Sequence, residues 1–335
     1  MSPPPNRTEL PDDAPTLAEI LAPAGYACGS FGKWHVGRTP QAEGFAPPPG
    51  AASDPALVAW AAARPHKKTG PIAADSVRFL RENRDRPFLL MVNFHAVHAP
   101  MEASAALVEA CRAKAVRGGV TNIDPVYAAM TEEADEALGR VLDELDALGL
   151  AGRTAVIYTS DNGGLIADPH LTPPAPLATC NLPLRSQKGD LYEGGIRVPL
   201  IVRWPGVARP GALCAEPVVT PDLFATILDI AGARGPEGAT DGLSLAPLLR
   251  GAGWPGRAAL HWHFPTSMWS RWPGGAIRKG RHKLIEFFDD GRAELYDLVD
   301  DPGETRDLAA SSPDVVAALR RSEEHTSELQ SRQSI

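Results

Sequence analysis

Residues 126–160 read VYAAMTEEADEALGRVLDELDALGLAGRTAVIYTS and place a helical pattern directly before a strand-like one. The first part has apolar residues mostly at helical spacing and acidic residues on the other face: Val126, Met130, Leu138, Val141, Leu142, Leu145 and Leu148. This spacing predicts an amphipathic helix that ends near Gly149 and Gly152. The short apolar run of residues 154–160 predicts a buried strand after it.

Further segments of both kinds lie on either side of this stretch. Apolar runs predict three more strands, over residues 26–31, 87–94 and 198–203, and the run at 87–94 is typical of a strand buried on both faces. Helices are expected after the capping box Thr16-Leu-Ala-Glu19, ending at Gly25, and over residues 75–81 and 222–232. Alternating strands and helices predict an α/β fold with a mostly parallel sheet.

Two regions depart from this alternation. Residues 44–70 are rich in Pro and Ala without a clear period and are interpreted as a surface connection. After about residue 255 the pattern changes to short segments at 276–278, 283–288 and 294–298, which predict a small antiparallel sheet. Residues 321–331 resemble a translated sequencing adapter, and residues 321–335 are excluded from the fold as a non-native tail, with a charged native helix as the alternative.

Composition excludes several classes of protein. The 335 residues are 44% hydrophobic and 22% charged, close to the globular norm, which excludes wholesale disorder. The net charge is −8 and no run of Lys or Arg is longer than two, so a nucleic-acid partner is not expected. No apolar stretch approaches the roughly 18 residues of a membrane span.

Polar residues follow three of the predicted strands, where open α/β sheets bind their ligands. The three stretches are Phe31-Gly-Lys33-Trp-His35, His95-Ala-Val-His98-Ala-Pro100 and Asp161-Asn162-Gly-Gly164. A fourth polar cluster, Lys188-Gly-Asp-Leu-Tyr-Glu193, comes before the strand at 198–203 instead.

The side chains in these clusters predict an anion site beside a divalent cation. Asp161 and Asn162 offer the hard oxygen ligands that Ca²⁺ or Mg²⁺ prefers, and Gly163-Gly164 lets the backbone come close to a ligand. Lys33 and Lys188 can neutralise a tetrahedral oxyanion, while His35 and His98 can donate hydrogen bonds or move protons. Each motif taken alone also fits a tight turn or a structural histidine.

Four ordered motifs together resemble the sulfatase family: Gly32-Lys33-Trp34-His35-Val36-Gly37, His98-Ala-Pro100, Thr159-Ser-Asp161-Asn162-Gly-Gly164, and Lys188 with Tyr192-Glu-Gly-Gly-Ile-Arg-Val-Pro199. The resemblance covers roughly residues 8–310. It implies an alkaline-phosphatase-like sheet sandwiched by helices, with a catalytic domain over residues 1–255 and a small C-terminal antiparallel sheet domain over 256–320. It also implies hydrolysis of sulfate monoesters, with a small-molecule or glycan sulfate ester as the partner.

The resemblance also implies a role for each matching residue. Lys33 and His35 would lie against a hydrated formylglycine nucleophile and the sulfate. His98 and Lys188 would bind sulfate oxygens and stabilise the leaving oxygen, and Asp161 and Asn162 would ligate Ca²⁺. One departure is Val97, where the family usually has Pro before the histidine.

Two family features do not occur in this sequence. The strand that ends in paired aspartates is missing, because Asp12-Asp13 follows a Leu-Pro dipeptide rather than an apolar strand. No Cys/Ser-x-Pro-Ser-Arg stretch, which carries the formylglycine, is present. We therefore expect an N-terminally truncated, inactive fragment with an incomplete Ca²⁺ site. The family's frequent export implies a periplasmic or extracellular parent enzyme.

Two alternatives to a sulfatase fragment remain open from the sequence. One is a non-catalytic relative that binds sulfated glycans or other anions through the same lysines and histidines. The other is a phosphonate or phosphate monoester hydrolase of the same superfamily, which shares the metal and oxyanion chemistry. The Glu-Gly-Gly-Ile-Arg-Val-Pro run favours the sulfatase over the second alternative.

Overall fold

The computed structural model describes residues 9–11, 14–50, 54–118, 123–166, 179–254, 256–265 and 272–321. The chain divides into two compact units. The first unit comprises Pro5–Ile157 and Ile201–Trp254, and the second comprises Met1–Pro4, Tyr158–Leu200 and Pro255–Ile335. The domain division expected from the sequence, 1–255 and 256–320, stays a prediction.

A parallel pair of strands forms the centre of the first unit. β1 (Ala27–Gly32) pairs with β2 (Phe88–Asn93) from end to end, so both strands finish at the same edge. On one face of the pair, Phe31 and Leu90 pack toward α3 (Thr69–Glu82). On the other face, Cys28 and Leu89 pack toward α1 (Leu17–Leu21) and α7 (Thr220–Ala231), giving the predicted α/β layering: helix, sheet, helix.

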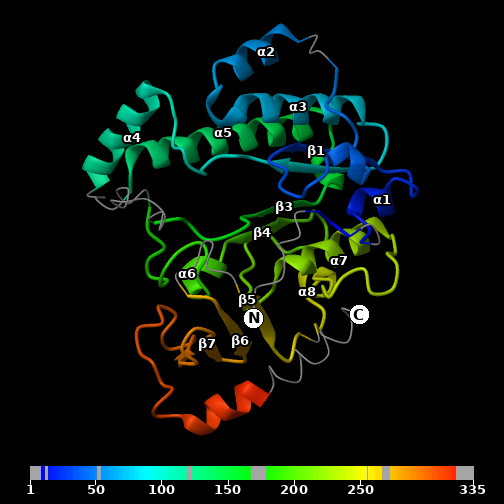
Figure 1. Ribbon diagram of the computed structural model, residues 1–335. Helices are drawn as coiled ribbons and strands as arrows, with labels where there is room; N and C mark the ends of the chain where they lie inside the picture. Colours follow the sequence, from blue (N-terminus) through cyan, green and yellow to red (C-terminus); the bar gives the residue numbers. More distant parts are fainter. Residues whose placement is uncertain are drawn as a thin grey trace. The chain divides into compact units, whose positions relative to one another are not determined.

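Two long helices extend the layer over β1 and β2. α3 packs against α5 (Pro125–Ala147), and Figure 1 shows the two running side by side. Their contact buries apolar side chains of both helices: Ala73, Leu80, Ala137, Val141 and Leu145. The predicted amphipathic helix is thus confirmed. α4 (Ala105–Gly118), which the sequence pattern did not reveal, also packs on α5.

The capping box predicted before the first helix is present. The Thr16 hydroxyl accepts from the Glu19 backbone N–H at 3.2 Å, and the Glu19 carboxylate accepts from the Thr16 N–H at 2.9 Å. Both bonds satisfy backbone donors that the helix itself leaves unpaired. The helix ends at Leu21 rather than at the predicted Gly25.

The prediction that residues 44–70 form only a surface connection is wrong. The segment contains α2 (Pro55–Ala62) and the 3₁₀ turn η2 (His66–Lys68), and α2 packs on α3. The Asp54 side chain caps α2, accepting from two backbone N–H groups, and Leu57 is fully buried. Asp54 followed by Pro55 is a sequence signal for the start of a helix. The Ala-rich residues after them show no helical period of apolar side chains, so the helix was not predicted.

The remaining elements of this part of the chain are short. η1 (Pro40–Glu43), η3 (Ala151–Arg153) and α8 (Ala246–Leu249) are single turns. β3 (Val156–Thr159) and β4 (Leu200–Arg203) form a second two-stranded sheet. Tyr158 and Ile201 are exposed on it, so the burial expected for the strand at residues 154–160 is not found among the described residues.

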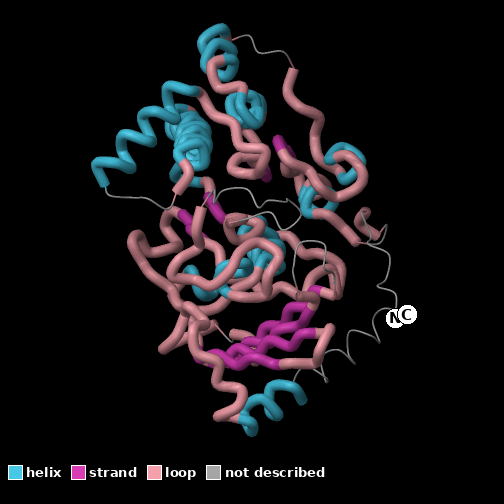
Figure 2. Tube along the Cα trace, turned by 60° about the vertical axis from the view of Figure 1, so that its left-hand side comes forward, coloured by secondary structure: helices cyan, strands magenta, loops and turns pink. Residues whose placement is uncertain are grey.

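A four-stranded antiparallel sheet forms the core of the second unit, as predicted. Its strands follow in order: β5 (Leu260–Phe264), β6 (Gly274–Lys279), β7 (His282–Phe287) and β8 (Ala293–Asp297). Figure 2 shows these strands in magenta, side by side.

Both faces of this sheet are covered. Leu191 and Tyr192, just before α6 (Glu193–Ile196), pack on one face. Leu319, from a helical segment at 313–321, packs on the other. Of the predicted non-native tail at 321–335, only Arg321 lies within the described residues.

Candidate active site

Lys33 lies directly after the paired ends of β1 and β2. Its backbone N–H donates to the carbonyl oxygen of Asn93 at 2.7 Å. Gly32 has φ +106°, and a Cβ on it would stand 2.0 Å from that same carbonyl. Only glycine fits such a position, so the glycine before Lys33 fixes where the lysine leaves the sheet.

His35 and His98 lie in the loops that follow these two strands. The indole N–H of Trp34 donates to the Val36 carbonyl at 3.1 Å and its ring packs on Phe45, which fixes the turn next to His35. The His98 Nδ1 lies 2.7 Å from the Ala99 carbonyl, so Nδ1 carries a proton and donates to it. Both imidazoles are exposed to solvent.

Three further residues without a role assigned from the sequence gather at this edge: the cationic Lys67 and Lys68, and the imidazole of His95. Burial lowers the pKa of His95, and the charges of Lys68, Lys33, Lys67 and His98 lower it further. The backbone N–H of Lys67 donates to Glu102 at 2.8 Å, which ties η2 to the loop after β2. The adjacent lysines and the histidine directly after the β2 strand were the sequence signals for this cluster.

Asp161 and Asn162 follow β3, as predicted. The Asp161 carboxylate is exposed and makes no ion pair with the described residues. The Asn162 side-chain N–H donates to the Gly163 carbonyl at 2.9 Å, so the amide oxygen is the atom of this side chain that could ligate a cation. The Ser160 hydroxyl donates to the Asn162 carbonyl at 2.9 Å and closes the turn.

Gly163 brings this turn against the backbone of α6. Its N–H donates to the carbonyl of Gly195 at 2.9 Å, and a Cβ on it would stand 1.8 Å from the carbonyl oxygen of Gly194. Gly163 was expected to let the backbone come close to a ligand, whereas in the structure it comes close to the backbone of Gly194 and Gly195. Either close approach, to a ligand or to other backbone, requires a residue without a side chain.

Lys188 lies beside the same turn. Its backbone N–H donates to the Gly164 carbonyl at 3.2 Å, and the Asn181 side-chain N–H donates to that carbonyl at 2.9 Å and to the Ser186 carbonyl at 2.9 Å. Asp161, Asn162 and Lys188 therefore come together in the second unit. Lys33, His35 and His98 come together in the first.

The donor set of Asp161 and Asn162 fits only part of a Ca²⁺ site. Ca²⁺ takes six to eight oxygen ligands, and these residues supply one carboxylate and one amide oxygen. Across the described ranges, no group of three or more His, Cys, Asp or Glu side chains could hold a metal ion. Asp12-Asp13 lies outside the described residues.

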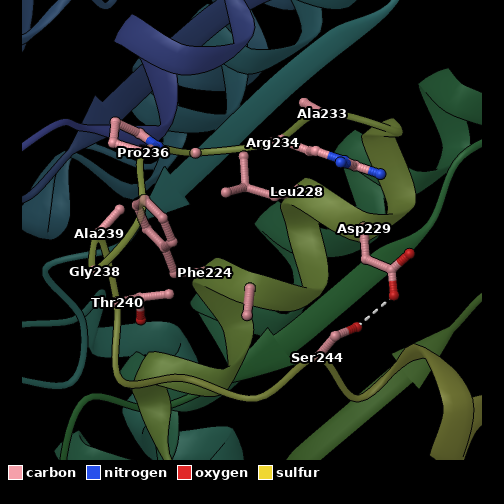
Figure 3. Close-up of a pocket in the computed structure, with 12 residues that line it drawn as sticks. Phe224, Leu228, Asp229, Ala233, Arg234, Pro236, Gly238, Ala239, Thr240 and Ser244 are labelled. Carbon is pink, nitrogen blue, oxygen red and sulfur yellow. Dashed lines mark hydrogen bonds between the residues drawn. The ribbon is translucent and has the colours of Figure 1, made fainter.

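An open groove elsewhere in the first unit contains none of these candidate residues. It lies between α7 and the loop after it, and Phe224, Leu228 and Arg234 contribute to its lining (Figure 3). The Ser244 hydroxyl donates to Asp229 at 2.6 Å across one end.

Among the helices of the described part of the chain, none has both the length and the apolarity needed to span a membrane.

Comparisons with known proteins agree with the motifs. The family model described as Sulfatase matches residues 1–233, and the model described as N-sulphoglucosamine sulphohydrolase, C-terminal, matches residues 187–330. A sulfatase of Formosa agariphila is 36% identical over 258 residues, which cover 70% of this chain and 44% of that protein. Mouse steryl-sulfatase is 34% identical over 269 residues, which cover 72% of this chain and 41% of that protein.

The fold agrees as well. The solved structure of BT4656, in complex with its substrate D-glucosamine-2-N,6-O-disulfate, superposes with a TM-score of 0.70 at 19% identity and covers 96% of this chain and 83% of that one. This likeness establishes the alkaline-phosphatase-like fold expected from the motifs. The chain spans less than half the length of the Formosa and mouse relatives. The family model's match to residues 1–233, together with these relatives, shows that the chain belongs to the sulfatase family.

Proposed function

We propose that this chain is part of a sulfuric ester hydrolase that acts on sulfate monoesters. The observation that carries the proposal is the cluster of cations at the ends of β1 and β2. Lys33, Lys67, Lys68 and His98 all act on His95 and lower its pKa. Such a concentration of positive charge would bind an anionic group, and a sulfate ester is the anion that the chain's family membership indicates.

The proposed roles are those that the sulfatase motifs imply for each matching residue. Lys33 and His35 would lie against the nucleophile and the sulfate, and His98 and Lys188 would bind sulfate oxygens and stabilise the leaving oxygen. Sulfuryl transfer resembles phosphoryl transfer, in which catalysis is mostly positioning and neutralisation of charge. Lysine ammonium groups and imidazole N–H groups supply both effects without forming a covalent bond.

Two groups that the family generally uses complete the proposal. Asp161 and Asn162 would hold Ca²⁺ through their side-chain oxygens, and the ion would offset the negative charge of the ester. A formylglycine would contribute the attacking hydroxyl, and the 335 residues contain no Cys/Ser-x-Pro-Ser-Arg stretch that could form it. An experiment on this chain can therefore test how its residues bind the ester, but not how the ester is hydrolysed.

We further propose that the ester belongs to a glycan. The structural neighbour BT4656 binds a disulfated glucosamine, and its fold matches this chain. An exposed cationic edge would also suit a sugar that carries more than one anionic group.

Calorimetry with 4-nitrophenyl sulfate and 4-nitrophenyl phosphate tests the proposal. Lys33→Met and Lys188→Met each remove one proposed contact, and Lys279→Met changes an exposed lysine at the end of β6 as the matched control. Because hydrogen bonds to charged groups are worth about 1.5–3 kcal/mol, each test variant is expected to bind the sulfate about tenfold or more weakly. The control is expected to bind as the unchanged chain does.

The other outcomes separate the alternatives. If the control loses as much affinity as Lys33→Met, binding is non-specific and the proposed sulfate site is wrong. Tighter binding of the phosphate than of the sulfate favours a phosphonate or phosphate monoester hydrolase. Binding without hydrolysis, in a polypeptide that also carries a formylglycine-forming segment, favours a non-catalytic anion-binding relative.

A further inference from the structure

A fully buried lysine lies between two buried carboxylates in the second unit. The Lys283 ammonium, on β7, lies 2.9 Å from the Glu193 carboxylate and 2.9 Å from the Glu304 carboxylate. The side chains of Lys283, Glu193 and Glu304 are 0, 3 and 0% exposed. Lys and Glu are almost never buried to this degree unless they are paired, so the three groups depend on one another.

The carboxylates do more than neutralise the lysine. The second carboxylate oxygen of Glu304 accepts the backbone N–H of Glu193 at 2.7 Å, so Glu304 holds both the ammonium and the first residue of α6. Burial raises the pKa of Glu304, and the Lys283 charge opposes that rise. On the outer side, Arg197 lies 3.7 Å from the second oxygen of Glu193 and balances the remaining negative charge.

The turn of α6 connects this buried trio to the candidate metal ligands. Glu193 opens the turn, and the carbonyl of Gly195 accepts the N–H of Gly163 at 2.9 Å. Within the turn, the N–H of Gly194 donates to the Arg185 carbonyl at 2.7 Å. Because these glycines touch backbone to backbone, a shift of α6 would carry the Asp161-Asn162 turn with it.

A second network holds the chain just before α6. The hydroxyl of Tyr192 donates to Glu294 of β8 at 2.7 Å, and the Tyr296 hydroxyl donates to the same carboxylate oxygen at 2.5 Å. The Arg185 guanidinium lies over the Tyr192 ring, 4.0 Å from its centre, and donates to the Tyr296 hydroxyl at 2.7 Å. The segment that carries Lys188 is thus attached to the C-terminal sheet on both sides of the lysine.

We propose that Lys283, Glu193 and Glu304 are positioning residues, which fix α6 and through it the Asp161 and Asn162 oxygens and the Lys188 backbone. Buried ion pairs often stabilise a fold no more than apolar residues of similar volume do, because desolvation of the charges offsets much of their attraction. What the trio adds is a defined geometry at the turn. The metal-binding role of the positioned oxygens rests on the proposed function, whereas the positioning itself does not.

Hydrogen exchange tests the positioning without any ligand. Glu304→Gln keeps one lysine with one carboxylate, but the Lys283 ammonium and the Glu193 N–H approach different oxygens of Glu304, so the amide NH2 would stand against one of these two donors. We expect exchange at the Gly163 and Gly194 amides to accelerate tenfold or more. Exchange in β6 and β7 is expected to stay unchanged. Glu286→Gln is the matched control, since it makes the same change on β7 in a more exposed pair with Arg320.

Two results would overturn the proposal. One is unchanged exchange at Gly163 and Gly194 in Glu304→Gln. The other is an equal increase across β6 and β7, which would indicate a loss of global stability only. Lys283→Met is a stronger second variant, and if it does not fold, Glu304→Gln still decides the matter.

Titration with Ca²⁺ gives a separate readout of the proposed metal role. We expect Glu304→Gln to weaken binding several-fold and Glu286→Gln to leave it unchanged. If the unchanged chain shows no Ca²⁺ binding that depends on Asp161, the proposed metal site fails. The exchange experiment would still test the positioning role in that case.

Discussion

The carbonyl oxygen of Asn93 lies 2.0 Å from the point where a side chain at Gly32 would begin. The two residues are partners at the end of the β1–β2 pair, and the next N–H, that of Lys33, donates to the same oxygen. One carbonyl therefore sets both the end of the sheet and the start of the loop that carries Lys33 and His35.

Gly32→Ala is expected to destabilise the first unit by about 2–4 kcal/mol. The methyl group would collide with the Asn93 carbonyl, and the φ of +106° is unfavourable for any residue with a Cβ. Urea denaturation followed by circular dichroism measures the change. Gly50→Ala is the control, because nothing lies within 4 Å of the added methyl group there. Equal effects of the two substitutions would contradict the close approach seen at Gly32.

Lys68→Met is expected to raise the pKa of His95 toward its ordinary value of about 6.5. Burial holds the pKa of His95 below that value, and Lys68 is the first of the charges that lower it further. Titration of the imidazole by NMR measures the shift. Lys114→Met, which removes a lysine not among those charges, should leave the pKa of His95 where it is. If the pKa of His95 is the same with and without Lys68, the proposed cluster of cations around His95 is wrong.

The lowered pKa of His95 also predicts how stability changes with pH. As the pH falls below about 6.5, the unfolded chain takes up a proton at His95 before the folded chain does. The free energy of unfolding should therefore decrease with falling pH until the folded imidazole is protonated as well. In Lys68→Met this dependence should be shallower, which denaturation series at several pH values would reveal.

Ca²⁺ binding by this chain is expected to be weak, with a dissociation constant of about 10⁻⁴–10⁻³ M or higher. Asp161 and Asn162 provide one charged and one neutral oxygen, and affinity rises with the number of carboxylates. Calorimetry with Ca²⁺ measures it, and Asp161→Ala should abolish it. Asp146→Ala removes a carboxylate at the end of α5 and serves as the control. Sub-micromolar binding that survives Asp161→Ala would place the ligands elsewhere.

Thr16→Ala is expected to cost about 1–2 kcal/mol of stability. The Thr16 hydroxyl accepts from Glu19 at the start of α1 and donates to the buried Glu43 carbonyl at 2.8 Å, so its loss leaves two backbone groups without a partner. Thermal denaturation measures the loss. Thr131→Ala is the matched control, since that exposed hydroxyl donates to the Tyr127 carbonyl within its own helix. A cost no larger than the control's would show that the cap does not stabilise α1.

Local patterns in the sequence predicted much of the fold. The apolar period of α5, the capping box at Thr16 and the apolar run of β2 depend on residues close together in the chain, so each could be identified without coordinates. α2 was missed because its Ala-rich sequence has no marked apolar face, and only its packing on α3, with Leu57 and Ala61 buried, distinguishes it from a surface connection.

The sequence by itself determined the order of the motifs and the residues that carry charge in them, because motif spacing is a property of the chain alone. Only the tertiary structure decided which groups act on one another. Lys283 forms ion pairs with Glu193 and Glu304, and the backbone of Gly163 lies against that of Gly194. The charge of Lys68 lowers the pKa of His95. In each case a stretch of chain separates the residues. No local pattern encodes such contacts, since they arise when helices and strands pack and exclude water between residues that are distant in sequence.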